Sequence, residues 1–439
     1  MSLKITRYSL YALLIFAPLA EGAIQGWAIS VILMVTLLAL TAFLLDKSLK
    51  WNWEWIKTPL DIPILCLLIF SLLSSFFSVQ EYTSLWSFIL LLNYIIIFYL
   101  IIQTLKTRKH LRHLTGVIIF VAAFLSIIGM LKKFGTNPFP WWNYDTGLNT
   151  DLAVSSSTFG NPNHFAGYLS MAIPLMLGLF FTGIKGGKLF FSILLTLLMM
   201  AALIFSISRG GWFSTAVGMA FMVTALLINQ YLKGKTMVLI VLVGLFFVTF
   251  IALSNRPVIH ELLTIKQASK DSSLQSRIQV WHKTIDMIRD YPWLGTGPGT
   301  FSTMFTQYQP PGFTSRFLRA HNDYLQFISE TGIPLIAIMV WLIIGLYLRG
   351  MTKLANLSRL IRGTTLGAMS GITALLFFSI FDFNLQIPAN AILFTVLAAI
   401  VVSPIPEPSD QMSEVGGQKA EYAGYRLSVN GYPGRAQRA

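Results

Sequence analysis

The sequence is poor in charge and in cysteine. Asp, Glu, Lys and Arg make up 11% of the 439 residues, whereas a soluble domain carries about 25%. Hydrophobic residues make up 55%, which is more apolar surface than a soluble fold can cover, so a soluble enzyme and a disordered protein are excluded. The single cysteine, Cys66, lies in an apolar run. It excludes a disulfide framework and a cysteine-based metal site.

Motifs for metals and nucleotides are also missing. The chain has no Asp-x-Asp or Asp-x-Glu pair, no His-Glu-x-x-His, and no glycine-rich loop followed by Lys-Ser or Lys-Thr. Enzymes that use a hard divalent cation need clustered carboxylates as oxygen ligands. We therefore expect any chemistry here to proceed without a metal ion or another cofactor.

What the sequence has instead is a series of long apolar runs. Runs of 18 or more residues with almost no charge predict membrane-spanning helices, and runs of this length favour helices over barrel strands. Twelve are predicted, at roughly 8–25, 27–45, 61–77, 84–104, 113–131, 165–183, 188–207, 211–230, 236–254, 332–348, 363–381 and 388–404. Glu21 interrupts the first run, and Lys4 and Arg7 precede it as in a signal peptide. Because the second run follows almost at once, we predict an uncleaved first helix.

The lysines and arginines predict the orientation. With the N-terminus in the cytoplasm, the inward loops and the tail hold 21 of the 32 basic residues, as the positive-inside rule requires. Both termini are then cytoplasmic, and the net charge of +14 reports topology. Because the basic residues are divided among short loops, they form no patch for nucleic acid. Arg209 contradicts the rule, since it lies in a short outward turn between two apolar runs.

Two predicted outward segments are too long to be simple connections. Residues 132–164 contain tryptophan and tyrosine, which favour the membrane interface. Residues 254–331 form a large loop between the ninth and tenth spans, within a transmembrane domain of residues 1–404. Its apolar residues predict an amphipathic helix at 272–290, with one face formed by Leu274, Ile278, Trp281, Ile285 and Ile288. A second helical pattern starts at His321, and the tail, 405–439, is predicted to be a disordered cytoplasmic end.

Three basic residues on this outward side fit a phosphate-bearing lipid. Arg209 and Arg277 offer planar, bidentate donors to phosphate oxygens, and His321 can take a proton from a hydroxyl. Gly210 and Gly211 would let a headgroup approach the backbone. Each has a plainer interpretation: Arg209 as an anchor at the headgroups, Arg277 as a solvated charge, and His321 as a helix-terminal residue. For His164 the structural interpretation is the stronger one.

The order of these motifs resembles the bacterial O-antigen ligase and polymerase superfamily. The resemblance rests on Gly160-Asn161-Pro162-Asn163-His164, Ser208-Arg209-Gly210-Gly211-Trp212, the stretch from Arg277 to Phe301, His321-Asn322-Asp323-Tyr324-Leu325-Gln326 and Glu330-Thr331-Gly332. It covers about residues 155–385. It implies a GT-C-type glycosyltransferase of the bacterial inner membrane that works at the periplasmic face without a metal. The implied donor is a glycan on undecaprenyl diphosphate, and the remaining partners are membrane lipids and the acceptor.

The resemblance also implies roles for individual residues. Arg209 and Arg277 would bind the donor diphosphate, and His321 would be the general base in a direct, inverting displacement. The supporting residues would be Asn322, Tyr324, Gly210, Gly211, Arg319 and His164.

The acceptor stays open between several alternatives. A ligase in lipopolysaccharide biosynthesis would use lipid A–core, which we favour, and a polymerase would use a lipid-linked repeat unit. A protein O-oligosaccharyltransferase would use Ser or Thr, and usually carries a larger soluble part. A lipid-glycan transporter would place basic residues inside the membrane, where this sequence has almost none. A non-catalytic scaffold would leave Arg209 and the histidine helix unexplained.

Overall fold

The computed structural model describes residues 2–51, 53–136, 155–228, 272–310, 312, 316–356 and 358–404. Within these ranges the regular structure consists of α-helices and short 3-10 turns, with no strand. The α-helices are α1 (Ser2–Leu19), α2 (Gly26–Leu49), α3 (Asp61–Phe76), α4 (Glu81–Thr104), α5 (Arg108–Lys133), α6 (Pro162–Phe180), α7 (Gly186–Phe205), α8 (Arg209–Ile228), α11 (Ser272–Asp290), α12 (Phe301–Met304), α13 (Asp323–Thr331), α14 (Leu335–Leu354), α15 (Arg359–Phe378) and α16 (Pro388–Val402). They belong to one compact unit, Met1–Pro404. The predicted tail lies outside the described residues.

The predicted all-α, polytopic architecture is confirmed. A helix occupies each predicted span except 236–254, which lies outside the described residues. Among the described helices, α2, α4, α5, α7, α8, α14 and α15 are long and apolar enough to cross a membrane, and α3 and α16 are shorter apolar helices. Glu21 lies in the 3-10 turn η1 (Glu21–Ala23) between α1 and α2. The acid that interrupts the first apolar run therefore marks the end of α1.

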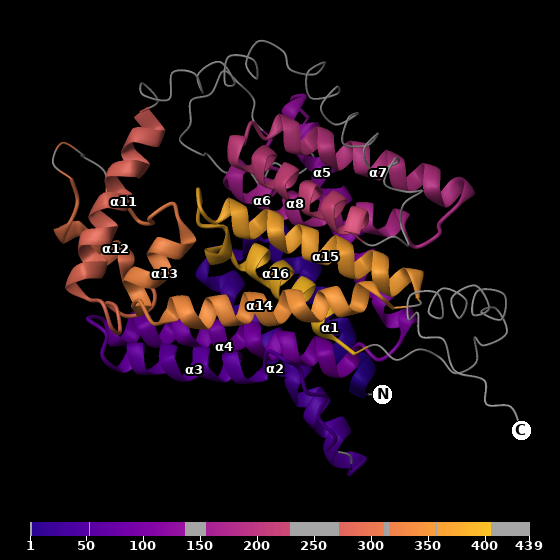
Figure 1. The fold of residues 1–439 in the computed structure, drawn as a ribbon, viewed down its shortest axis with the longest axis horizontal. Helices are drawn as coiled ribbons and strands as arrows, with labels where there is room; N and C mark the ends of the chain where they lie inside the picture. The colour runs from indigo at the N-terminus through magenta and orange to yellow at the C-terminus, as the bar shows by residue number, and fades with distance from the viewer. Residues whose placement is uncertain are drawn as a thin grey trace, which may run out of the picture. The chain divides into compact units, whose positions relative to one another are not determined.

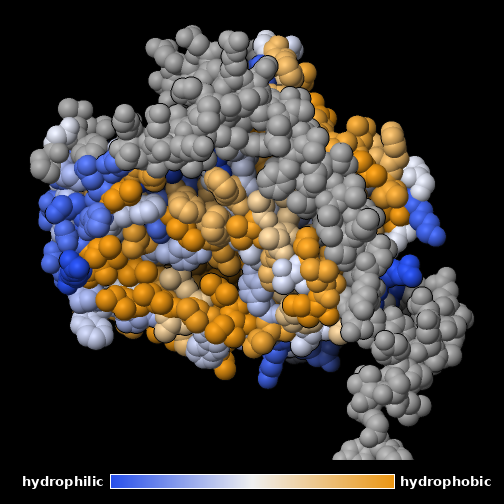
Figure 2. Space-filling model, turned by 45° about the horizontal axis from the view of Figure 1, so that its top comes forward, coloured by the Kyte–Doolittle hydropathy of each residue, from blue (hydrophilic) through white to orange (hydrophobic). Residues whose placement is uncertain are grey.

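The helices differ in how much of their apolar surface the protein itself covers. In the apolar window of α15, 72% of the residues are buried, whereas the corresponding share is 17% in α14 and 33% in α2, α4 and α7. The uncovered side chains form a broad hydrophobic area on the bundle, while hydrophilic residues gather at the end that carries α11 (Figure 2). Only an apolar medium can cover so much exposed hydrophobic surface at low cost, as expected of a multi-pass membrane protein.

Small residues let α6 and α15 pack closely at the centre. A methyl group at Gly178 would overlap the carbonyl of Gly363, and one at Gly367 would overlap the backbone at Pro174. Close approach through small residues is the usual way in which helices associate in membranes. Fifteen residues of α6 are buried, so the first turn of this helix, which carries His164, is held firmly in place.

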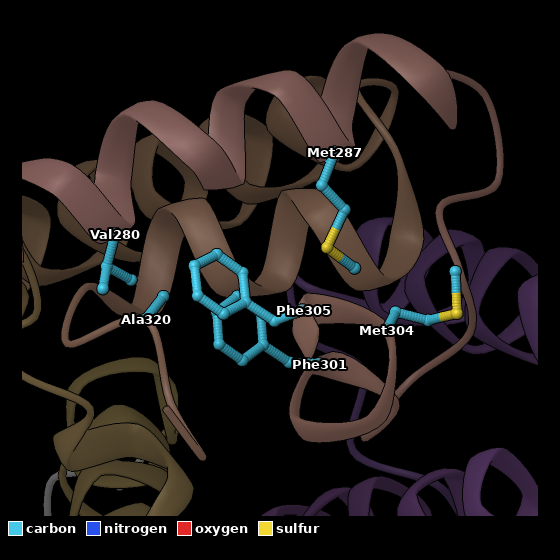
Figure 3. Close-up of a cluster of buried hydrophobic side chains, with 6 residues drawn as sticks. All are labelled: Val280, Met287, Phe301, Met304, Phe305 and Ala320. Atoms are coloured by element: carbon cyan, nitrogen blue, oxygen red, sulfur yellow. The ribbon is translucent and has the colours of Figure 1, made fainter. Parts of the chain in front are cut away.

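The long loop between the ninth and tenth spans carries a small core of its own. α11, α12 and α13 lie together at one end of the bundle, which we name the α13 end (Figure 1). Their core consists of Val280, Met287, Phe301, Met304, Phe305 and Ala320 (Figure 3). The rings of Phe301 and Phe305 stack with centroids 4.8 Å apart. These contacts give the loop a fixed shape against the membrane helices.

The helix predicted at 272–290 is confirmed as α11, and its apolar face is only partly covered by the protein. Ile278 and Ile285 are 40% and 37% exposed, whereas Val280, Thr284 and Met287 are fully buried. The spacing of the aliphatic residues does not indicate that a threonine is buried among them. Thr284 is accommodated because its hydroxyl donates to the carbonyl of Val280 at 2.7 Å.

A glycine-rich turn docks the loop onto the α3–α4 hairpin. The amide of Val79 donates to the carbonyl of Thr296 at 3.1 Å, and the hydroxyl of Ser74 donates to the carbonyl of Leu294 at 2.7 Å. Gly297 has φ +104°, and a methyl group there would overlap the side chains of Ser78 and Ser84. The turn over residues 295–300, named the glycine turn, is therefore a structural joint.

Candidate active site

A short polar segment follows α15 and organises the α13 end. This segment, residues 379–387, includes the 3-10 turn η6 (Asn384–Gln386). The carboxylate of Asp323 accepts from the hydroxyl of Ser379 at 2.8 Å and from the amide of Leu385 at 3.0 Å, while the Asp323 amide donates to the Ser379 carbonyl at 2.8 Å. Gln326 donates to the side-chain oxygen of Gln386 at 3.0 Å. The 379–387 segment is thus tied to α13 at several points.

His321 faces a buried carboxylate of the 379–387 segment. Its Nδ1 lies 3.4 Å from Oδ1 of Asp382, and the two side chains are 32% and 1% exposed. Nδ1 is itself buried. The imidazole therefore has one nitrogen directed to a carboxylate, while about a third of the side chain stays exposed.

The sequence pattern predicted a helix that starts at His321, but the structure does not place His321 in a helix. α13 begins at Asp323, and the side chain of Asn322 caps it by accepting from the amide of Leu325 at 3.0 Å. His321 precedes the cap with φ +50°, a left-handed conformation that a residue with a side chain rarely adopts. Such strain is kept where the surrounding contacts require it, and it is common at functional sites.

Asp382 is buried and yet stays ionised. Burial raises the pKa of its carboxyl, but the interactions with His321, His164 and Arg277 outweigh burial and hold the pKa below its usual range. Its Oδ1 also accepts from the amide of Phe383 at 2.9 Å. The carboxylate is therefore fixed in direction beside the imidazole of His321.

A second imidazole also contacts Phe383. The ring centroids of His321 and His164 are 5.0 and 4.9 Å from that of Phe383, each in an edge-to-face arrangement. His164 is in the first turn of α6, is 6% exposed, and has no hydrogen-bond partner for Nε2 among the described residues. Phe383 therefore packs against both imidazoles.

Arg277 reaches the same segment from α11. Its guanidinium donates to the carbonyl of Phe381 at 2.8 Å. Its positive charge helps to lower the pKa of the neighbouring Asp382 carboxyl. Arg277 is half-buried, on the side of α11 that faces the bundle, and is not a plain solvated charge. One of its five N–H donors is used in this bond, which leaves others for a ligand.

Arg209 opens α8 at the α13 end. It is half-buried, and the next residue, Gly210, packs against the ring of Phe378 at the end of α15. Gly211 packs against Ala166 of α6 in the same way. The side chains of neighbouring helices thus fill the space in front of both glycines, where we had expected a headgroup. Their role here is to let α8 approach α6 and α15, which brings Arg209 to this end of the bundle.

Two of the remaining predicted residues are structural in their contacts. Asn322 is the cap of α13, and the hydroxyl of Tyr324 donates to the carbonyl of Leu376 in α15 at 2.7 Å. Arg319 is half-buried, and its charge reaches both His164 and Glu330. The structure therefore gathers Arg277, His321 and His164 on the 379–387 segment. It places Arg209 beside the end of α15, which leads into that segment.

Sequence reasoning missed two residues that join these groups, and it gave no role to Asp323 of the quoted motif. Asp382 and Phe383 carry no motif spacing to His321, because the contacts depend on how α13 packs against the end of α15. The available signal was Asp382 itself, an acid placed directly after a long apolar run. Among the described residues, no group of three or more His, Cys, Asp and Glu is arranged to hold a metal ion.

A comparison with known families matches part of the chain. Residues 194–340 match the sequence model of a family described as O-antigen ligase, and this match supports membership of the O-antigen ligase and polymerase superfamily. The matched stretch includes Arg209, Arg277 and His321, whereas His164 and Asp382 lie outside it. No curated protein matches the chain.

Proposed function

From this family match, we propose that the protein is an O-antigen ligase-like glycosyltransferase. It moves a glycan from undecaprenyl diphosphate to a hydroxyl of lipid A–core, at the periplasmic face of the bacterial inner membrane. The observation that carries the proposal is the buried Asp382 carboxylate beside His321, on a segment that also binds Arg277. In this orientation the α13 end faces the periplasm, and both termini are cytoplasmic.

His321 is the general base. Nε2 accepts the proton of the acceptor hydroxyl as the hydroxyl oxygen bonds to the anomeric carbon. The bond from that carbon to the phosphate oxygen breaks, the diphosphate leaves with the electron pair, and the configuration inverts. Asp382 keeps Nδ1 directed inward and stabilises the imidazolium that forms. General-base catalysis of this kind contributes typically 10²–10⁴-fold.

Arg209 and Arg277 bind the diphosphate and stabilise the charge that grows on it. Charged, planar donors suit phosphate oxygens, and donors fixed before the reaction give the largest benefit where negative charge develops. Arg277 is already oriented by its bond to Phe381. Arg209 opens α8, and the amides of a helix N-terminus carry a partial positive charge that adds to its attraction for an anion. In this scheme the arginines supply the positive charge that a metal ion supplies in other transferases, and no metal is needed.

Four further residues support this arrangement. Asn322 and Tyr324 hold α13, and with it His321, against α15. Arg319 adds positive charge near the base. His164 packs against Phe383 and has a buried nitrogen that has no hydrogen-bond partner among the described residues. It keeps Phe383, and thereby Asp382, in position.

Reconstitution with a lipid-linked glycan donor and two competing acceptors tests the function. Purified protein in proteoliposomes receives undecaprenyl-diphosphate glycan together with equal amounts of lipid A–core and lipid-linked repeat unit. We expect the glycan on lipid A–core. A product on the repeat unit would make the enzyme a polymerase that uses the same donor site. If folded protein modified neither acceptor, the proposal would fail.

A further inference from the structure

Three exposed tryptophans lie at the end of the bundle opposite the α13 end. Trp51, Trp53 and Trp55 are 89%, 59% and 50% exposed, in the connection between α2 and α3. Large indole side chains are rarely left so exposed in a connection without a reason. They require a surrounding that is partly apolar and partly polar.

The connection presents these side chains on a fixed backbone. The amide of Ile56 donates to the side-chain oxygen of Gln103 at 3.2 Å, and the Gln103 side chain donates back to the Ile56 carbonyl at 3.1 Å. The Trp55 ring lies 5.4 Å from that of Tyr99, centroid to centroid. The ammonium group of Lys47 donates to the carbonyl of Glu54 at 2.5 Å. The segment is therefore held against α2 and α4.

This connection lies at the level where the apolar helices end. α2 ends at Leu49 and α4 ends at Thr104, and the two helices flank the segment. In a bilayer the ends of spans coincide with the headgroups, where tryptophan and tyrosine are enriched. The three indoles are thus placed at the boundary between acyl chains and headgroups.

Positive charge surrounds the segment. The basic residues of α1, of the last turn of α2, of the α2–α3 and α4–α5 connections and of the start of α5 are Lys4, Arg7, Lys47, Lys50, Lys57, Lys106, Arg108, Lys109 and Arg112. The acids at the end of α2, in the α2–α3 connection and at the start of α3 are Asp46, Glu54 and Asp61. Asp46 pairs with Lys50 at 2.7 Å, and Asp61 accepts from Thr58 and Tyr99. A surplus of cations therefore faces outward.

Contacts between helices gather this charge into one place. The guanidinium of Arg7, on α1, contacts the imidazole of His110, in the first turn of α5. Lys106 and Lys109 are exposed on either side of the start of α5. Basic groups brought together without an equal number of acids attract an external anion.

We propose that this end of the protein binds anionic phospholipid headgroups, with the tryptophans at the acyl boundary and the lysines and arginines on the phosphates. A soluble polyanion would satisfy the cations but would leave the three indoles in water. An anionic lipid satisfies both, which is why we assign the surface to a membrane lipid. The inference does not depend on the transferase reaction at the other end.

Native mass spectrometry of the purified full-length protein tests the site. The detergent-solubilised protein is titrated with phosphatidylglycerol and, separately, with phosphatidylcholine. We expect preferential retention of phosphatidylglycerol. Lys106→Gln with Lys109→Gln should weaken its binding about fivefold for each charge removed. Lys185→Gln with Lys188→Gln removes two exposed lysines at the start of α7 and is the matched control, which should bind as wild type.

A second pair of variants separates a lipid from a free phosphate. Trp51→Ser with Trp53→Ser keeps every cation, and should weaken phosphatidylglycerol binding while leaving retention of inorganic phosphate unchanged. The proposal is overturned if Lys106→Gln with Lys109→Gln binds phosphatidylglycerol as wild type does, or if the control pair loses binding equally. It is also overturned if the tryptophan variant binds phosphatidylglycerol as tightly as wild type.

Discussion

The glycine turn and the 379–387 segment are both polar loops packed between helix ends, but their polar groups have different surroundings. At the glycine turn, the buried carboxylate of Glu330 of α13 accepts from the amides of Gly299 and Phe301 at 2.9 and 3.2 Å, and from the side chain of Gln326 at 3.0 Å. In the 379–387 segment, Asp382 faces an imidazole that is partly open to a ligand. A loop whose polar groups are all hydrogen-bonded within the protein stabilises the fold. A loop that holds a polar side chain partly exposed to a ligand is suited to catalysis.

This comparison divides the motif residues into two classes. Substitutions in the glycine turn should lower stability without changing the rate of the intrinsic reaction. Substitutions at His321 and its neighbours should lower the rate of glycan transfer without unfolding the protein. The following variants test that division, from the largest expected effect to the smallest.

His321→Ala should have the largest effect. Removing the base should lower the rate of glycan transfer by about 10²–10⁴-fold, because no neighbouring side chain has a nitrogen in the same place. The variant should still purify as a folded membrane protein, since the imidazole is partly exposed. Transfer in proteoliposomes and thermal unfolding in detergent measure the two properties. Near-normal transfer would remove His321 from the mechanism.

Arg277→Lys and Arg209→Lys should each lower the rate of glycan transfer less than His321→Ala does. Lysine keeps the charge but loses the planar fork, and a hydrogen bond to a charged group is worth about 1.5–3 kcal/mol. We therefore expect a loss of about tenfold to a hundredfold in kcat/KM. Arg289→Lys, on the same helix as Arg277 but exposed beside Asp286, is the matched control. A silent swap at both arginines would exclude the bidentate diphosphate role.

Gly297→Ala should damage the glycine turn. The added methyl group meets Ser78 and Ser84, and the left-handed backbone is unfavourable for alanine. We expect a loss of about 1–3 kcal/mol in the free energy of unfolding, visible as a lower Tm. The fraction that stays folded should transfer glycan at the wild-type rate. An unchanged Tm with reduced transfer would move this turn into the active site.

Asp323→Asn should have the smallest effect on transfer and should change the pH dependence of stability. Burial raises the pKa of the Asp323 carboxyl to about 7, well above about 3.9 in an unfolded chain. The folded state then binds the proton more tightly. The stabilisation is complete below about pH 4 and is lost as the pH rises to about 7, by up to about 1.4 kcal/mol per pH unit. The variant should flatten the fall in Tm between about pH 4 and 7, and an equally steep fall would contradict this.

The sequence predicted the helices well because hydropathy and periodicity report burial in an apolar medium. It placed α11 and nearly all the spans, and it selected Arg209, Arg277 and His321. It did not find Asp382, because a single acid has no periodic pattern and its partner lies on a different helix. It also placed His321 inside α13, since periodicity does not register that Asn322 caps the helix and strains the residue before it. The sequence also did not show that Gly210 serves packing, because its contact with Phe378 exists only in the folded chain.

The most direct test of the central claim is a double-mutant cycle on His321 and Asp382, measured as the rate of glycan transfer by protein of equal thermal stability. If the carboxylate acts through the imidazole, Asp382→Asn should slow transfer on its own, and adding it to His321→Ala should cause almost no further loss, because residues that act as a unit are not additive. If the two losses multiply instead, the two side chains act independently, and the account of a paired base is wrong.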